Sequence, residues 1–224
     1  MDFLTDPGNV DTYLEAFWWI LRLTVTSAVI AVVLGTLLAA MRVSPIPVLR
    51  WFGTAWVNVF RNTPLTLIIF FCYFGLFATL GLKFSDDIPL NLFWLGVIGL
   101  SVYTAAFVCE AIRSGINTVP AGQAEAARAI GLTFAQTLRI VVLPQAGRAV
   151  VAPLGSVFIA LAKNSTIVGT IGLAEASNTM KQFINDYGDE VIPIFLVFAG
   201  TFAVVLIPIG YLFGWLANKL AVKR

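Results

Sequence analysis

The sequence predicts an all-α membrane protein with about five transmembrane helices, and three observations support this. Of its 224 residues, 59% are hydrophobic and only 12% are charged, and the mean hydropathy is +0.90. A soluble domain is about half apolar and about a quarter charged. The apolar residues gather into five runs, each close to the roughly 20 residues that cross a bilayer. Lipid is therefore the expected solvent for most of the chain.

The five apolar runs are separated by segments that are richer in charge and proline. They are Phe17–Ala40, Pro64–Leu82, Leu92–Ile112, Ala149–Ile171 and Val191–Leu216. The residues before the first run include four acidic side chains and no Lys or Arg, which is unlike the basic start of a cleaved signal peptide. We therefore expect the first run to remain as a permanent span. An odd number of spans places the two termini on opposite sides of the membrane.

The orientation follows from the distribution of Lys and Arg, which are retained on the cytoplasmic side. With the N-terminus outside, ten basic residues fall in inner loops and the inner tail, while only Lys83 and Lys181 fall in outer loops. We therefore expect a single transmembrane domain of residues 1–224. In it, residues 1–16 are an external N-terminus and residues 217–224 a cytoplasmic tail.

Between the first two runs, residues 48–61 combine Trp51, Phe52, Trp56 and Phe60 with arginines. Aromatic rings beside cations are typical of the membrane interface. This pattern predicts an interfacial helix that leads into the second span.

The longest polar segment, residues 113–148, contains its own helix signals and is predicted to be cytoplasmic. Pro120 can open a first helix, and Gly131 can close it with a left-handed residue. Thr133 and Gln136 match a capping box, which predicts a second helix that ends before Pro144. Two short helices are therefore expected to meet at a glycine.

The first of these two helices is rich in alanine, so another backbone can approach it closely. Glu125 and Arg128 are three residues apart and can pair along one face. Periodicity alone leaves open a second interpretation, in which the helix lies on the lipid headgroups.

Several segments of the chain resemble the permease subunits of bacterial ABC importers. Glu125-Ala126-Ala127, followed by Gly131 and Leu143-Pro144, looks like the EAA loop of these subunits. Further similar segments are Arg61–Leu65, Glu110–Ile116, Gly122–Arg128, Pro144–Ala146 and Leu161–Thr166. Together they are most similar to the polar amino-acid branch of the family (histidine, glutamine and glutamate permeases), and within it to actinobacterial glutamate permeases.

This resemblance implies a type I ABC importer permease fold and a transport function powered by other chains. It implies a second like or homologous permease, two ATP-binding subunits, an external solute-binding protein and a polar amino acid, in the nearest branch glutamate, as substrate. In the family the EAA loop couples to the ATPase, which here implicates Glu125, Ala126, Ala127, Arg128 and Gly131. The implied location is the bacterial cell membrane, in contact with lipid and with no nucleic-acid partner.

The sequence contains no histidine and no phosphate-binding G-x-x-x-x-G-K-[ST] loop. We therefore expect a non-catalytic subunit without a cofactor of its own, with ATP and Mg²⁺ bound by the partner ATPase. The alternatives are a secondary transporter or channel not powered by ATP, and a membrane-embedded enzyme. The first would need internal repeats, which are not seen, and the second would need a denser set of intramembrane polar residues.

The polar residues within the apolar runs are the candidate site residues. Lys163 in the fourth run is costly in lipid, so it is expected to face water or the bundle interior and to receive an anionic group of the substrate. The alternative for Lys163 is a buried ion pair or a carbonyl-bonded lysine that holds the spans together. Further candidates for the substrate path are Asn164, Ser165, Thr166 and Arg22, although Arg22 can also reach the outer surface. Glu110 is expected to pair with a nearby arginine and, like Arg61, to support a gate or the cytoplasmic loop.

Overall fold

The structure is a computed structural model that describes residue 3 and residues 5–220. All elements of secondary structure in these residues are helices. The α-helices are α1 (Pro7–Val43), α2 (Pro47–Asn62), α3 (Leu65–Phe70), α4 (Ile88–Asn117), α5 (Ala121–Ala129), α6 (Phe134–Gln136), α7 (Leu143–Asn164), α8 (Ala176–Asp186) and α9 (Val191–Leu220). Phe71–Thr79 and Thr137–Val142 are π-helical, and Ser165–Ile171 and Gly188–Glu190 are 3₁₀-helical.

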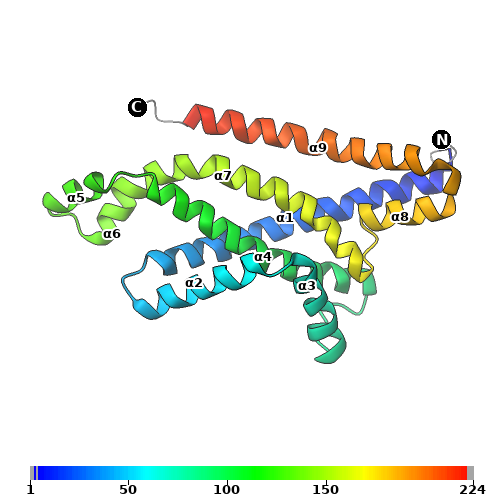
Figure 1. Ribbon diagram of the computed structural model, residues 1–224, viewed down its shortest axis with the longest axis horizontal. Helices are drawn as coiled ribbons and strands as arrows, with labels where there is room; N and C mark the ends of the chain where they lie inside the picture. The colour runs from blue at the N-terminus through cyan, green and yellow to red at the C-terminus, as the bar shows by residue number, and fades with distance from the viewer. Residues whose placement is uncertain (1–2, 4, 221–224) are drawn as a thin grey trace.

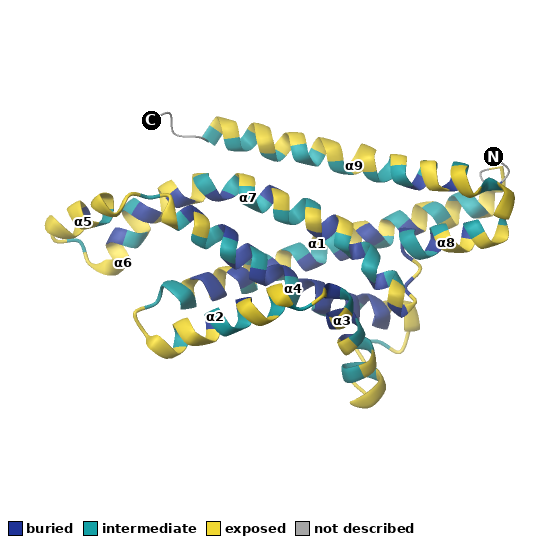
Figure 2. Cartoon of the chain, viewed as in Figure 1, coloured by how far each residue is buried: buried dark blue, intermediate teal, exposed yellow. Residues whose placement is uncertain are grey.

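The long helices α1, α4, α7 and α9 run along the longest axis of the molecule (Figure 1). Helices α5 and α6 form one end, which we call the coupling-loop end, and α8 lies at the opposite end beside the first turns of α1 (Figure 1). In the most apolar stretch of α4, 72% of residues are buried, against 11% for α9. Figure 2 shows the same contrast, with α4 at the centre and α9 along one edge. Helix α4 is therefore the core of the bundle.

Four helices of the described residues are long and apolar enough to cross a membrane, and a bent pair can supply a fifth span. The four are Pro7–Val43, Ile88–Asn117, Phe134–Ile171 and Gly188–Leu220. The bent pair joins α2 to Leu65–Thr79 through an angle of 103°. Four of the five predicted apolar runs lie in these four helices, and the remaining run, Pro64–Leu82, overlaps the second half of the bent pair.

Helix α2, which the sequence predicts as an interfacial helix, packs along the bundle. It turns back along the end of α1 (Figure 1), where Val57 is buried with Leu38 of α1 and with Ala105 and Cys109 of α4. The helix that turns away from the bundle is α3, which follows the bend. The reason is that one face of α2 carries small and apolar residues that fit against α1 and α4, and burying this face stabilises the hairpin.

The second helix of the predicted cytoplasmic pair does not end before Pro144. Helix α6 continues through the π-helical residues Thr137–Val142 directly into α7, so it begins the fourth span. The backbone N–H of Leu143 donates to the carbonyl of Leu138, five residues earlier. Proline can follow at this point because the hydrogen-bond pattern is changing and the first turn of α7 needs no donor there.

Candidate functional site

Lys163 lies in the wall of an open cavity of about 500 Å³ between the end of α7 and the middle of α9. This volume is within the usual range for small-molecule sites. Most of the wall is apolar, and its polar side chains come from Lys163 and Thr166. The apolar lining consists of Ile159, Phe202, Ala203, Leu206 and Ile207.

The Lys163 side chain is exposed to this cavity and has no ion-pair or hydrogen-bond partner among the described residues. The structure therefore does not show the buried ion pair that is the alternative interpretation of this lysine. An ammonium group between apolar walls, on a helix long and apolar enough to cross a membrane, is stabilised by an anion that enters the cavity. The arrangement is suited to holding a carboxylate.

The polar residues after Lys163 mark the point where the helix changes type. Helix α7 ends at Asn164, and a 3₁₀-helix follows. The hydroxyl of Ser165 is buried and donates to the carbonyl of Ala162 at 2.8 Å, while the hydroxyl of Thr166 donates to the carbonyl of Lys163 at 2.8 Å. Asn164 and Ser165 do not line the cavity, so of the five residues predicted for the substrate path the structure brings only Lys163 and Thr166 to it.

Arg22 lies apart from the Lys163 cavity. Its guanidinium carbon is 4.9 Å from the ring centroid of Trp18 and 5.2 Å from that of Trp19, on the exposed side of α1. Such cation–π contacts stabilise an exposed arginine by roughly 0.5–1 kcal/mol. This geometry favours an anchoring role for Arg22 near the N-terminal end of α1.

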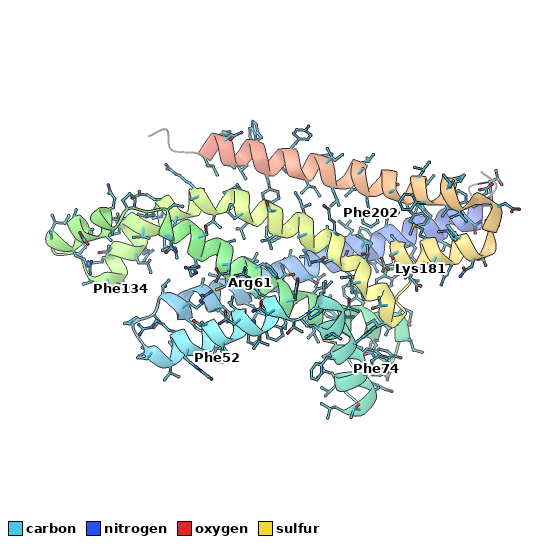
Figure 3. All side chains as sticks on the ribbon, viewed as in Figure 1. Phe52, Arg61, Phe74, Phe134, Lys181 and Phe202 are labelled. Carbon is cyan, nitrogen blue, oxygen red and sulfur yellow. The ribbon has the colours of Figure 1, made fainter. Side chains whose placement is uncertain are left out.

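The α9 side of the cavity is not predicted from the sequence. Figure 3 shows Phe202 between α9 and the helices beneath it, and its ring centroid is 5.2 Å from that of Phe17. A second, largely apolar cavity of about 330 Å³ shares Phe202 and Leu206 with the first and reaches α1 at Phe17 and Trp18. Apolar residues of a spanning helix give no signal of a site in the sequence, because lipid-facing positions look the same.

Three arginines surround the carboxylate of Glu110 of α4 near the coupling-loop end. It forms ion pairs with Arg42 at the end of α1, with Arg61 at the end of α2 (3.6 Å) and with Arg113 one turn further along α4 (2.9 Å). The Glu110 and Arg42 side chains are only 20% and 15% exposed. The carboxylate therefore holds α1, α2 and α4 together. Arg61 also lies over the ring of Phe107, at 5.7 Å from its centroid.

We expect Glu110→Gln to lower the thermal stability of the purified chain, by about 3 kcal/mol in free energy of unfolding. Removing one partner of a mostly buried ion pair leaves the other charge, here that of Arg42, without compensation. Thermal unfolding in detergent measures the effect, with Glu15→Gln on the exposed face of α1 as the matched control. Equal stability of the two variants would show that the arginine cluster is not a structural tie.

Gly131 ends helix α5 in the left-handed conformation, as the sequence predicts, with φ of +91°. The N–H of Gly131 donates to the carbonyl of Arg128 at 3.0 Å, and the N–H of Leu132 donates to that of Ala127 at 3.2 Å. This is the Schellman arrangement, which favours glycine at this position. The capping box of Thr133 and Gln136 follows, so the bend between α5 and α6 is defined at both sides.

The surface of this bend is open to a partner. Glu125, Ala126 and Arg128 are exposed, whereas Ala127 is buried. The described residues show no ion pair between Glu125 and Arg128, so both charges are available at the surface. Ile130 is 81% exposed and Phe134 is 58% exposed beside them. An exposed apolar pair flanked by charges is typical of a surface that binds another protein.

Helix α8, at the end opposite the coupling loop, is predicted from the sequence only as loop. It begins at a buried carboxylate, Glu175, whose oxygens accept hydrogen bonds from the backbone N–H groups of Ser177 (2.9 Å) and Asn178 (3.0 Å). Burial raises the pKa of the Glu175 carboxyl to about 7, although these hydrogen bonds and Lys181 favour the charged form. The segment between the fourth span and α8 therefore contains a buried titratable group, the Glu175 carboxyl.

We expect stability to fall as the pH rises from about 4.5 to about 7. Glu175 has a higher pKa in the folded chain than the usual value of 4.5, so the folded state binds more protons in this range. The contribution is fully present below the unfolded pKa and lost as the pH passes the folded pKa, with a total of about 3 kcal/mol. Thermal unfolding from pH 5 to pH 8 measures it. Glu175→Gln should flatten this dependence and Glu15→Gln should not; identical slopes would contradict the assignment.

Comparison with known families gives a match over most of the chain. Residues 31–222 match the family described as "Binding-protein-dependent transport system inner membrane component". The chain is 49% identical to the glutamate transport system permease protein GluC of Corynebacterium efficiens, over 94% of this chain and 95% of that protein. It is 34% identical to the glutamate/aspartate import permease protein GltK of Escherichia coli O157:H7, over 90% of each chain.

Solved structures share the arrangement of helices. A crystal structure of an amino acid ABC transporter with histidines superposes with a TM-score of 0.86 at 28% identity, covering 98% of this chain and 99% of that one. An inward-facing structure of the MetNI methionine ABC transporter superposes with a TM-score of 0.76 at 20% identity, covering 97% and 100%, and shows the same fold. The chain therefore belongs to the family of binding-protein-dependent transport system inner membrane components.

Proposed function

We propose that this chain is the permease subunit of an ATP-driven importer of polar amino acids, and that its substrate is glutamate. The observation that carries the proposal is the 49% identity to a glutamate permease over nearly the full length of both chains. The cavity at Lys163 supports it, because every amino acid brings a carboxylate and glutamate brings two. In this proposal the ammonium group of Lys163 receives a carboxylate, and the Thr166 hydroxyl oxygen beside it can accept a hydrogen bond from the amino group of the substrate.

Energy comes from two partner ATP-binding subunits, which hold ATP and Mg²⁺. The exposed surface of α5 and the Gly131 bend, with Glu125 and Arg128 at its edge, is the proposed contact with these subunits. Closure of the ATPase then moves the loop and, through the continuous helix from α6 into α7, the segment that bears Lys163. This connection is supported by the absence of a break between Phe134 and Ile171.

A second permease chain and an external solute-binding protein complete the proposed importer. The second chain is like or homologous to this one, and the largely exposed α9 offers it a surface. The binding protein delivers the amino acid at the α8 end. The N-terminus then lies outside the bacterial cell membrane and the C-terminus inside, as the distribution of Lys and Arg predicts.

Competition for uptake tests the substrate. Cells that lack their own glutamate uptake would express the chain with the subunits that copurify with it, and uptake of labelled glutamate would be measured. Unlabelled glutamate should compete most strongly, ahead of aspartate, glutamine and arginine. Stronger competition by arginine or glutamine would leave the importer assignment standing but would contradict glutamate as the substrate.

A further inference from the structure

A cavity of about 710 Å³ lies at the coupling-loop end of the bundle, away from Lys163. It is formed by the end of α1, the length of α2 and the end of α4. Its polar lining consists of Arg42, Arg50, Thr54, Asn58 and Arg113, with Trp51 at the same wall. Neither the substrate path nor the proposed ATPase contact uses this cavity.

The cavity retains an excess of positive charge. The Glu110 carboxylate pairs with Arg42 and Arg113 of the cavity and also with Arg61. One negative charge therefore balances only part of the positive charge of three arginines. Arg50 donates to the backbone carbonyls of Ser44 (3.1 Å) and Pro45 (3.3 Å) and has no acidic partner among the described residues. Arginine presents several N–H donors in a plane, which suits a phosphate group.

Helix α2 presents two different faces at this place. Its polar residues Arg50, Thr54 and Asn58 recur every four positions and face the cavity. Beside them is an apolar face that remains exposed, with Val48 and Trp51 each 71% exposed and Phe52 44% exposed. Figure 3 shows Phe52 on the outer side of α2. An anion bound here therefore has an apolar surface next to it.

We propose that this cavity binds the headgroup of an anionic phospholipid, with the lipid chains lying along the exposed apolar face of α2. The guanidinium groups of Arg50, Arg42 and Arg113 contact the phosphate, and Thr54 and Asn58 supply further polar contacts to the headgroup. Basic pockets between spans at the cytoplasmic side of membranes recognise such headgroups. A free phosphate ion would use the arginines but would leave the apolar face uncovered. The exposed Trp51 also fits the depth of the headgroups.

Lipid binding to the purified complex tests the proposal. The complex of this chain with the subunits that copurify with it would be titrated with phosphatidylglycerol in detergent, and bound lipid would be counted by native mass spectrometry. Arg50→Gln is expected to weaken binding at this site about fivefold, the factor that one arginine contributes to binding an anionic lipid. Arg148→Gln, an exposed arginine of α7 at the same end and outside the cavity, is the matched control and should change the affinity less than about twofold. Asn58→Asp, which adds a negative charge to the wall and keeps every arginine, should also weaken binding.

Three results would overturn the proposal. The first is equal affinity for phosphatidylglycerol in Arg50→Gln, Asn58→Asp and Arg148→Gln. The second is either of two binding results. Equal binding of phosphatidylcholine would indicate that the net charge of the headgroup plays no part, and displacement of phosphatidylglycerol by millimolar inorganic phosphate would indicate that the lipid chains play no part. The third is absence of phosphatidylglycerol binding in this complex together with binding to the chain alone, which would show that the partner subunits cover the cavity.

Discussion

Replacing Lys163 with methionine is expected to reduce uptake of glutamate about 10- to 100-fold while the complex still assembles and hydrolyses ATP. The methionine keeps most of the length and the apolar stem of the side chain but removes the ammonium group. A hydrogen bond to a charged group contributes roughly 1.5–3 kcal/mol, which corresponds to this range of affinity. Because Lys163 has no partner among the described residues, its loss breaks no internal ion pair. Uptake into proteoliposomes at glutamate concentrations below saturation measures the effect.

Two further variants separate a role in the substrate path from a general effect of charge. Lys163→Arg keeps a cation at the cavity and should retain more uptake than Lys163→Met. Lys83→Met removes an exposed lysine of the loop before α4 and should behave as the unaltered chain. If Lys163→Met transports normally, or if it fails to assemble, the lysine does not act on the substrate in the proposed way.

Replacing Gly131 with valine is expected to leave insertion intact and to lower uptake at least about tenfold by uncoupling the chain from its ATPase. The glycine has φ of +91°, and no atom lies within 4 Å of the position a Cβ would take, so the effect comes from the backbone and not from a collision. A side chain in the left-handed region costs roughly 1–2 kcal/mol, and more when it is β-branched. The bend between α5 and α6 should therefore change direction. Uptake and transport-linked ATP hydrolysis, measured together, report the uncoupling.

Matched glycine variants test whether the conformation at residue 131 is the cause. Gly131→Asn should recover much of the uptake, because asparagine adopts the left-handed conformation more readily. Gly147→Val places the same side chain at a helical glycine of α7 with open space around it, and uptake should be close to normal. Equal coupling in Gly131→Val and Gly147→Val would contradict the proposed role of the bend.

The sequence predicts the spans well because each is an apolar run of bilayer length. It also predicts the left-handed Gly131 and the capping box at Thr133, since both depend on a few neighbouring residues. It does not predict α8, whose stability depends on Phe183 packing against α1 and α9 and on the buried Glu175 at its start. Its prediction for the end of α6 is wrong, because a change of helix type carries the helix on into α7. The packing of α2 against α1 and α4 is not predicted, because contacts between distant elements decide it.

The residues of the candidate site also divide into those that the local sequence predicts and those that depend on packing between distant elements. Lys163 is predicted because a cation in an apolar run is unusual, and Glu110 is expected to find an arginine. The cavity itself requires α9, where Phe202 and Leu206 are indistinguishable from lipid-facing residues in the sequence. Ser165 is grouped with Lys163 by adjacency, but the turn of the helix buries it away from the cavity. The convergence of three arginines on one carboxylate likewise depends on packing of α1, α2 and α4.

ATP-dependent accumulation of glutamate tests the central claim most directly. Proteoliposomes would contain the complex of this chain with its copurifying subunits, ATP would be supplied on the side of the coupling loop, and the solute-binding protein and labelled glutamate on the other. The proposed importer concentrates glutamate above its external level, and this accumulation disappears when the ATP-binding subunits carry a substitution that abolishes hydrolysis. Accumulation that persists without ATP hydrolysis, driven by an ion gradient, would identify a secondary transporter and contradict the account.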